Sequence, residues 1–433
     1  MKRKLNDKLI AWKNKPGHKP LIIFGARQVG KTYLVHDFGK SFYDNIYEIN
    51  FELTPEAKWI FEDNLDVDNL IIKLSAYNPN SKITNKTLLF FDEVQKCPQV
   101  LTALKSFALD GRYDVIVSGS MLGIIMDKVS SYPVGYVDTI KMEPMSFEEF
   151  LWANNYSEEM IQGFKKYYDN EEMVPEVIHN KLIELFKYYV IVGGMPDVVK
   201  TFIQTKNISD VIETQKKILD DYRNDIAKYA TPNKRENVRE CFEAIPEQLA
   251  KENKKFQYKF IKEGGNARYF SNSLGWINDS GIGFKVNRLK TFDIPLKAYR
   301  DIASFKYYFN DTGLLLAFYD ENVQGKIMQG DVGVFKGGIF ENVIAQSMLF
   351  NGLPIYYYRR DDRMEIDFVT YLKGNIVPIE VKSGTNTKSV SLNNLISKND
   401  LSYGIKLSMN NVNCTNPKLK CFPLYMILFI KEE

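Results

Sequence analysis

The chain is poor in the residues that cross-link small folds or bind metals. Its 433 residues include only four cysteines and three histidines. The cysteines, Cys97, Cys241, Cys414 and Cys421, are scattered without CxxC spacing, which argues against a disulfide scaffold and a zinc site. With so few histidines we expect no histidine-rich metal centre, and a Ser-His-Asp triad has few candidates.

Long apolar runs and a strong net charge are also missing. No stretch reaches the roughly 18 apolar residues of a membrane-spanning helix, so we expect no membrane span. The first twenty residues are basic but hold no apolar segment, so no secretory signal is expected and the cytoplasm is the default compartment. A net charge of +3 is too small to indicate a nucleic-acid partner by itself.

The sequence does have the length for several domains. At roughly 150 residues per domain, 433 residues suggest two to four. In the first third, short apolar runs alternate with helical patterns; the runs are residues 21–24, 46–51, 87–91 and 114–119. Buried strands separated by amphipathic helices predict an α/β fold with a doubly wound parallel sheet over residues 1–145.

The rest of the chain begins with helical patterns. Ser146 and Glu149 have the S-x-x-E spacing of a helix-capping box. We expect a helical lid over residues 146–230, a more basic and mainly helical stretch over 231–300, and mixed α and β structure over 301–433.

The strongest motif is a phosphate-binding loop. It consists of Gly25, Ala26, Arg27, Gln28, Val29, Gly30, Lys31 and Thr32. This is G-x-x-x-x-G-K-[ST] between a predicted strand and a predicted helix, the setting that the motif requires. Its glycines let backbone N–H groups turn toward phosphates, Lys31 would reach the β- and γ-phosphates, and the Thr32 hydroxyl would bind Mg²⁺. The motif therefore predicts a site for ATP and Mg²⁺.

Two further strand ends complete the predicted site. Asp92 and Glu93 follow the apolar run 87–91, where Asp92 would hold the Mg²⁺ shell and Glu93 would orient or deprotonate the attacking water. Ser118-Gly119-Ser120 ends the next strand, and we favour Ser120 as a sensor of the γ-phosphate over simple turn chemistry. Arg112 and Arg223 are candidates for an arginine acting on a neighbouring subunit, although a surface role is favoured for each.

Residues 251–290 are strongly basic. They hold nine Lys and Arg against three acidic residues, a net charge of +6. Predicted helices followed by Gly281, Gly283 and a hairpin suggest a winged helix-turn-helix. Its recognition helix would begin with Asn266, Arg268, Tyr269, Asn272 and Ser273, and its N-terminal end would meet DNA bases. A basic face used for protein contact is the alternative.

A carboxylate and lysine set lies near the end of the chain. A two-residue turn at Lys373-Gly374 would place Asp367 opposite Glu380, with Lys382 on the same face. Such a set can bind Mg²⁺ and position water, and Glu341 could add a carboxylate. The alternative is an inert cluster of ion pairs left from a nuclease ancestor, which we favour over an active nuclease.

Together these motifs resemble a known group. GARQVGKT, LLFFDEVQ, GGMPDVV, FKYYFNDTGLLLA, FENVIAQ and EIDFVTYLKGNIVPIEVKSG are similar to prokaryotic AAA+-type ATPases with a C-terminal domain of unknown function. That domain resembles the PD-(D/E)xK nuclease superfamily. The resemblance implies a P-loop ATPase core with a helical lid, a winged helix and a restriction-endonuclease-like α/β domain. It also implies ATP and Mg²⁺ at residues 25–32, 92 and 93, and a nuclease-like core of Asp367, Glu380 and Lys382.

One departure from the group leaves two functions open. Relatives often carry a basic residue after Gly135, where this chain has Tyr136. The first hypothesis is an ATPase whose nucleotide state positions C-terminal domains, possibly on DNA. The second is a nucleotide-switched signalling or defence protein that binds a protein partner, with slow turnover, no DNA contact and an inactive nuclease-like domain. A Mg²⁺-dependent nuclease is a third. An oligomer is a further possible assembly.

Overall fold

The computed structural model divides the chain into two compact units. It describes residues 1–125, 133–319, 322–329, 336–360, 364–384 and 389–432. The first unit comprises residues 1–143 with 279–281, and the second comprises 144–278 with 282–433. Among the described residues, no helix combines the length and the apolar character needed to span a bilayer.

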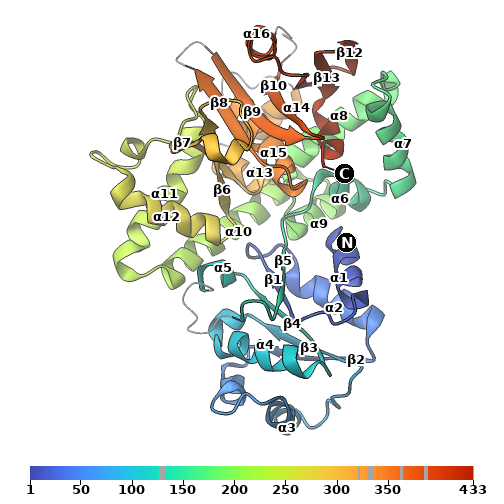
Figure 1. The fold of residues 1–433 in the computed structure, drawn as a ribbon, viewed down its shortest axis with the longest axis vertical. Helices are drawn as coiled ribbons and strands as arrows, with labels where there is room; N and C mark the ends of the chain where they lie inside the picture. The colour runs from blue at the N-terminus through green and yellow to red at the C-terminus, as the bar shows by residue number, and fades with distance from the viewer. Residues whose placement is uncertain (126–132, 320–321, 330–335, 361–363, 385–388, 433) are drawn as a thin grey trace. The chain divides into compact units, whose positions relative to one another are not determined.

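The first unit alternates strands and helices (Figure 1). Its elements are α1 (Leu5–Asn14), β1 (Leu21–Phe24), α2 (Lys31–Phe42), β2 (Asn45–Asn50), the 3₁₀ helix η1 (Pro55–Phe61), α3 (Val67–Tyr77), β3 (Thr87–Asp92), the 3₁₀ helix η2 (Val94–Lys96), α4 (Gln99–Asp110), β4 (Asp114–Gly119), α5 (Leu122–Ile125) and β5 (Asp138–Lys141).

The five strands form one parallel sheet in the order β2-β3-β4-β1-β5. One face, which includes Ile22, Leu89 and Val117, packs on η1, α3 and α4 in a single apolar core. The alternate residues face α2, where Gly39 lies against Leu88. Because the strands are parallel, the carboxyl ends of β1, β4 and β3 lie next to one another at one edge of the sheet.

The predicted parallel sheet is confirmed, with one strand more than expected. Four strands lie within one residue of the apolar runs in the sequence. The fifth, β5, has no such run, since its residues Asp138-Thr-Ile-Lys141 alternate between half-exposed and exposed at the sheet edge. A one-sided edge strand carries too little apolar signal to be distinguished from a loop.

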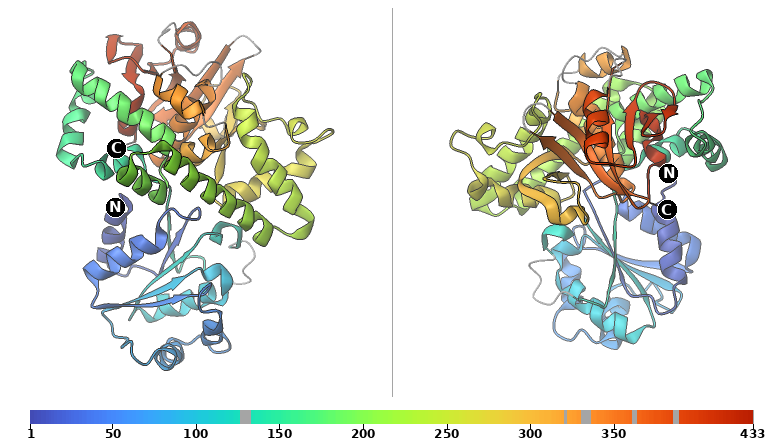
Figure 2. Two further views of the ribbon diagram at one scale, coloured as in Figure 1. Left: turned by 180° about the vertical axis from the view of Figure 1, so that it is seen from behind. Right: turned by 45° about the horizontal axis from the view of Figure 1, so that its top comes forward.

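The second unit combines helices with a larger sheet (Figure 2). Its elements are α6 (Phe147–Ala153), α7 (Glu158–Asp169), α8 (Glu176–Val192), α9 (Pro196–Thr205), α10 (Ile208–Tyr229), α11 (Pro232–Leu249), η4 (Tyr258–Phe260), α12 (Ala267–Asp279), β6 (Gly283–Leu289), η5 (Leu296–Tyr299), β7 (Arg300–Phe309), α13 (Thr312–Leu316), α14 (Asn322–Gln329), α15 (Lys336–Phe350), β8 (Tyr356–Arg360), β9 (Met364–Leu372), β10 (Asn375–Val381), α16 (Val390–Lys398), β11 (Gly404–Ser408), β12 (Asn413–Asn416), β13 (Leu419–Pro423) and η6 (Leu424–Phe429).

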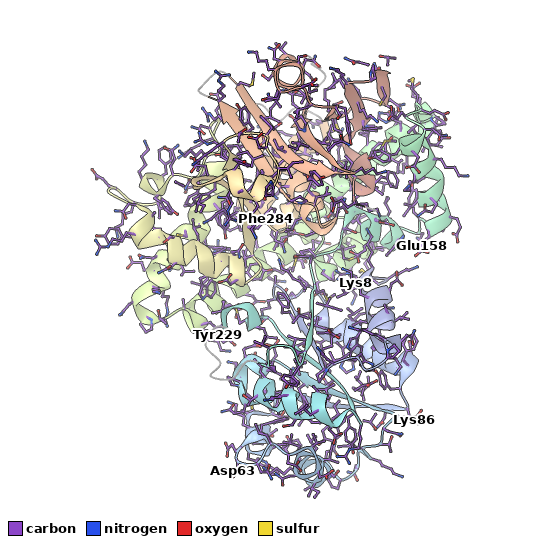
Figure 3. All side chains as sticks on the ribbon, in the orientation of Figure 1. Lys8, Asp63, Lys86, Glu158, Tyr229 and Phe284 are labelled. Atoms are coloured by element: carbon purple, nitrogen blue, oxygen red, sulfur yellow. The ribbon has the colours of Figure 1, made fainter. Side chains whose placement is uncertain are left out.

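The predicted capping box starts the helical part of this unit. The Ser146 hydroxyl accepts from the Glu149 backbone N–H at 3.4 Å, and the Glu149 carboxylate accepts from the Ser146 N–H at 2.7 Å. In the side-chain view, Glu158 marks the start of α7 and Phe284 marks β6 (Figure 3). The helical character predicted from residue 146 is therefore confirmed, although it is divided among several separate helices.

Eight strands form one continuous mixed sheet in the order β12-β13-β11-β10-β9-β8-β6-β7. Helix α16 packs on one face through Leu392, Leu395 and Ile396, and α15 contacts β7 and β10. The hairpin between β9 and β10 turns at Lys373-Gly374, where both residues have positive φ as a type I′ turn requires. The predicted turn and register are therefore confirmed.

The segment 231–309 has the order of elements expected of a winged helix. Helix α11, the short helix η4 and helix α12 precede the antiparallel hairpin of β6 and β7. This hairpin is also part of the large sheet, because β6 pairs with β8. The sheet thus runs without a break across residue 300, and the division into 231–300 and 301–433, like the lid at 146–230, remains a proposal.

Candidate functional site

The loop after β1 has a backbone that few residue types can adopt. Gly25, Gln28 and Gly30 all have positive φ, and Gly30 leads directly into α2. At Gly25 a Cβ atom would lie 2.1 Å from the carbonyl oxygen of Met142, so no larger residue fits. The strand, loop and helix therefore form the phosphate-binding conformation that the motif predicts.

The Lys31 side chain turns back into its own loop. It is 7% exposed, and its Nζ donates to the carbonyl oxygens of Gly25 at 3.0 Å and Ala26 at 2.8 Å. A second buried cation braces the loop from outside: Arg3 donates to the Val29 carbonyl at 2.8 Å and to the Glu143 carbonyl at 2.6 Å. The sequence analysis missed Arg3, which precedes any recognisable motif.

Asp92 lies at the centre of the site. Its carboxylate accepts from the Thr32 hydroxyl at 2.9 Å and from the Asn50 side chain at 3.1 Å. It also accepts from the Ser118 hydroxyl and from the backbone N–H of Glu93. The structure thus brings the phosphate-binding loop and the acidic strand end to the same point. Asn50 was not predicted, although it follows directly from the pairing of β2 with β3.

Glu93 follows Asp92 in the left-handed backbone region, with φ of 53°. Its carboxylate accepts from the Gln95 side-chain amide, whose same nitrogen lies 3.3 Å from the Ser120 hydroxyl. Burial and the adjacent Asp92 carboxylate raise the pKa of Glu93 above its usual range, and Lys31 opposes this shift. Glu93 and Ser120 are therefore joined through Gln95, a residue that the sequence analysis did not single out.

Each of the two candidate arginines is held in ion pairs. Arg112 contacts Asp110 at 2.6 Å and Asp68 at 2.5 Å, at the end of the sheet where β4 begins. Arg223, on α10, contacts Glu243 and Asp220, both at 2.8 Å. A role for either in a neighbouring subunit stays a prediction.

The departure at Tyr136 is only partly described. The Tyr136 ring lies 5.2 Å from the Lys105 ammonium, and Ser131 and Tyr132 of the same segment lie outside the described residues.

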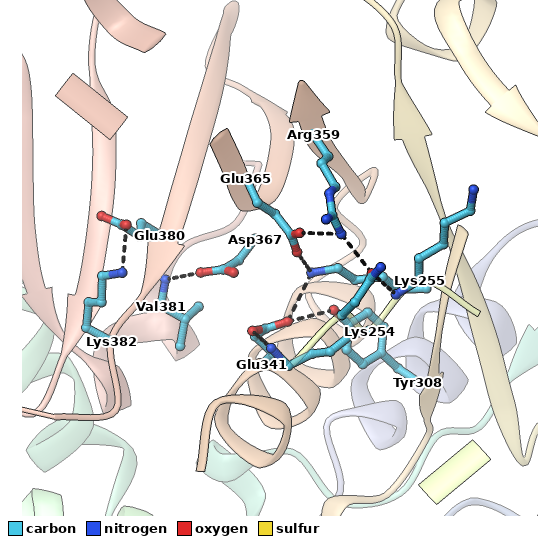
Figure 4. Close-up of polar contacts among 12 residues, drawn as sticks. Lys254, Lys255, Tyr308, Glu341, Arg359, Glu365, Asp367, Glu380, Val381 and Lys382 are labelled. Atoms are coloured by element: carbon cyan, nitrogen blue, oxygen red, sulfur yellow. Dashed lines mark hydrogen bonds and ion pairs between the residues drawn. The ribbon is translucent and has the colours of Figure 1, made fainter. Parts of the chain in front are cut away.

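The predicted nuclease-like residues lie within a larger buried charge cluster (Figure 4). Asp367 accepts from the backbone N–H of Val381 at 2.8 Å, at the end of the ladder where it lies opposite Glu380. Lys382 pairs with Glu380 at 2.8 Å. Asp367 therefore bonds to the residue between Glu380 and Lys382, and a nuclease-like role for these three residues stays a prediction.

Glu341 joins the cluster through a lysine that the sequence analysis missed. Lys306, on β7, lies 3.1 Å from Glu341 and 2.6 Å from Glu365. The other oxygen of Glu341 pairs with Lys254 at 2.8 Å. In the sequence, Lys306 is 35 residues from Glu341 and 59 residues from Glu365, so only the pairing of β7 and the packing of α15 reveal its position.

In the comparisons with known proteins, three parts of the chain match family models. Residues 17–151 match a family model described as an AAA domain. Residues 183–324 and 336–426 match two domains of unknown function, DUF8612 and DUF4143. An uncharacterized protein of Haemophilus influenzae is 26% identical over 157 residues, which are 35% of this chain and 38% of that relative. The aligned part thus spans well under half of the curated relative.

The solved structures with some similarity include a Walker-type ATPase, an ORC1 protein and a DnaA protein. A Walker-type ATPase of Pyrococcus abyssi has a TM-score of 0.43 at 13% identity, covering 73% of this chain and 95% of that one. The ORC1 protein of Aeropyrum pernix, in complex with DNA, has a TM-score of 0.29 at 10% identity, covering 76% and 91%. AMPPCP-bound DnaA from Aquifex aeolicus has 0.29 at 14% identity, covering 64% and 86%. Such values are too low to support a conclusion about fold or function.

The family match and the loop geometry agree for the first unit. The matched range contains the phosphate-binding loop, the acidic strand end and Ser120. No family match assigns a nuclease or a winged helix to the second unit. Residues 17–151 therefore match the model of an AAA domain and contain the P-loop sequence.

Proposed function

We propose that the first unit binds ATP with Mg²⁺ and hydrolyses it. The observation that carries the proposal is the 2.9 Å contact between the Thr32 hydroxyl and the Asp92 carboxylate, which unites the loop with the acidic strand end. Hydroxyl and carboxylate oxygens are ligands that Mg²⁺ prefers, so these residues fit the ion. Bound there, Mg²⁺ would neutralise charge on the phosphate oxygens.

Lys31 and the loop amides would bind the triphosphate. The Lys31 ammonium now satisfies two carbonyl groups of its own loop, and it would exchange them for β- and γ-phosphate oxygens. The backbone N–H groups from Gly25 to Thr32, at the N-terminus of α2, favour an anion there.

Glu93 would take the proton of the attacking water. Burial raises the pKa of Glu93. A carboxylate with a raised pKa is a better general base than an ordinary one, because its pKa lies closer to the operating pH. Ser120, which shares the Gln95 amide with Glu93, is placed to sense the γ-phosphate.

The test separates binding from hydrolysis. Lys31→Ala is expected to abolish ATP binding at concentrations that saturate the parent, measured by titration calorimetry, whereas Lys40→Ala on the exposed side of the same helix should bind normally. Glu93→Gln should still bind ATP but hydrolyse it at least about 100-fold more slowly, the contribution of a general base. Unchanged ATP affinity in Lys31→Ala would refute the assignment.

DNA contact by the second unit is a further candidate function, with 231–300 acting as a winged helix. The exposed side chains of Asn266, Arg268, Tyr269 and Asn272 gather at the start of α12, while Ser273 is buried. Exposed polar and cationic groups at a helix N-terminus suit a recognition helix.

Anisotropy of a labelled DNA duplex tests this function at about 50 and 200 mM salt. Binding that falls steeply with salt supports DNA contact. Arg268→Ala should weaken it, and Lys200→Ala, an exposed cation on α9, should not. No binding even at low salt would instead favour the protein-partner alternative.

A further inference from the structure

The charge cluster of the second unit has a lysine at its centre. The Lys306 side chain is 1% exposed, and its ammonium lies 2.6 Å from Glu365 and 3.1 Å from Glu341. The two carboxylates come from β9 and α15, and Asp367 lies beside them (Figure 4). Three acidic side chains from two elements thus converge on a cation that the chain itself supplies.

The carboxylates of the predicted nuclease-like set already have partners. Both oxygens of Glu341 are occupied, one by Lys254 at 2.8 Å and the other by Lys306, with the Tyr308 hydroxyl at 3.3 Å. Asp367 accepts from the backbone of Val381. Mg²⁺ demands near-octahedral oxygen ligands, and over the described part of the chain no group of acidic, histidine or cysteine side chains is arranged to hold a metal. These residues therefore do not fit a divalent cation.

Electrostatics explains why the lysine stays charged in this place. Burial by itself would lower the pKa of Lys306, but the carboxylates of Glu341 and Glu365 raise it well above its usual value. Burial by itself would raise the pKa of Glu341, but the ammonium groups of Lys306 and Lys254 lower it to about 2. Removing one partner of a buried ion pair is strongly destabilising, so acids without a lysine here would need another cation.

We propose that Lys306 is a resident cation, whose ammonium takes the place of a divalent metal among Glu341, Glu365 and Asp367. The second unit is then a nuclease-like fold without metal-dependent cleavage. Without the ammonium the buried acids would lack a cation, so its removal should let Mn²⁺ or Mg²⁺ bind in its place.

The test measures Mn²⁺ binding to the full chain, without nucleotide, by electron paramagnetic resonance. Four proteins are compared: the parent, D367N, K306Q and K306Q/D367N. The parent and D367N should bind the same amount of Mn²⁺, K306Q should gain one site, and the double variant should lose it. Any Mn²⁺ held near Asp92 is common to all four. K420Q, which removes the lysine of a different ion pair with Glu171, is the matched control and should gain nothing.

Two results would overturn the proposal. One is Mn²⁺ bound by the parent and lost in D367N while Lys306 is intact. The other is a folded K306Q that binds no additional Mn²⁺.

If K306Q does not fold, the comparison of the parent with D367N still tests the proposal. Cleavage of a plasmid incubated with Mg²⁺ or Mn²⁺ is then the second readout. Cleavage by the parent that D367N abolishes would overturn the proposal, and equal Mn²⁺ binding with intact plasmid in both would support it. Neither readout depends on the ATP site.

Discussion

At the residue scale, one amide nitrogen joins two parts of the proposed ATP site. The Gln95 Nε2 donates to the Glu93 carboxylate and lies 3.3 Å from the Ser120 hydroxyl. Gly119 makes this packing possible, because a Cβ there would lie 2.2 Å from the Gln95 Oε1. Gln95 is therefore a positioning residue for the base and for the sensor, not a group that touches phosphate.

Gln95→Ala should slow hydrolysis without weakening binding. Glu93 would lose the donor that fixes its orientation, so we expect kcat to fall by roughly 10-fold or more, within the range that general bases contribute. The ATP affinity should change little, because Gln95 contacts no residue of the loop among the recorded hydrogen bonds. Gln99→Ala, an exposed glutamine four residues on, is the control. A matched loss of ATP affinity would show instead that Gln95 only supports the fold.

The residues of the site could be predicted to different extents. The loop is one continuous motif, and Asp92 and Glu93 directly follow an apolar run, so both segments can be recognised from the sequence alone. Gln95 lies in a sharp turn, Asn50 on a neighbouring strand and Arg3 in the segment before α1, and none of these leaves a motif. Ser118 rather than Ser120 contacts Asp92, because Ser118 lies within β4 beside the end of β3, whereas Ser120 comes after the last residue of β4.

At the element scale, the connection from β1 to α2 depends on its first glycine. Gly25 has φ of 147°, and its Cα faces the carbonyl group of Met142, the residue directly after β5. Apolar runs in the sequence predict strands of this sheet. They do not indicate that the loop at Gly25 lies close to the backbone of Met142.

Gly25→Ala should therefore disrupt the loop. The added methyl group would clash with a backbone oxygen and force an unfavourable φ, a strain of about 1–3 kcal/mol or more. We expect a lower melting temperature and loss of ATP binding, measured by calorimetry. Gly163→Ala is the matched control: Gly163 lies inside α7 with open space around it, where alanine should be neutral or stabilise by up to about 1 kcal/mol. Normal ATP binding by Gly25→Ala would contradict the account of the loop.

The second sheet could be predicted only in part. The turn at Lys373-Gly374 fixed the register of β9 and β10 because two-residue hairpins leave few alternatives. The partnership of β6 with β8 joins residues about 70 positions apart, and no local pattern indicates it. The position of Lys306 could not be predicted for the same reason, although its ammonium is the cation that contacts Glu341 and Glu365 in the cluster.

At the scale of the whole molecule, the two units have separate cores and should respond differently to acid. In the first unit, Asp114 lies at the amino end of β4, accepting from Tyr43 at 2.7 Å and contacting His18 at 2.8 Å and Lys13 at 3.5 Å. Burial alone would raise the pKa of Asp114, but the hydrogen bonds from Tyr43 and His18 lower it overall.

A carboxyl whose pKa falls on folding stabilises the folded state above its unfolded pKa of about 3.9 and loses this contribution as the pH drops through the lower folded value. We therefore expect the melting temperature of the first unit to fall more between pH 5 and pH 3 in the parent than in Asp114→Asn. Asp37→Asn, an exposed acid on α2, should behave like the parent. Differential scanning calorimetry checks this, and identical acid profiles for the parent and Asp114→Asn would contradict it.

The pairing of β6 with β8 limits where the chain can be divided into fragments. Cutting the chain near residue 300 would separate the two strands of one hairpin and strip β8 of its neighbour. The newly exposed sheet edge would present unpaired backbone N–H and C=O groups that can pair with a strand of another molecule, so such fragments should aggregate. Fragments prepared to study the basic helices or the acidic cluster in isolation should therefore retain the entire stretch from residue 144 onward.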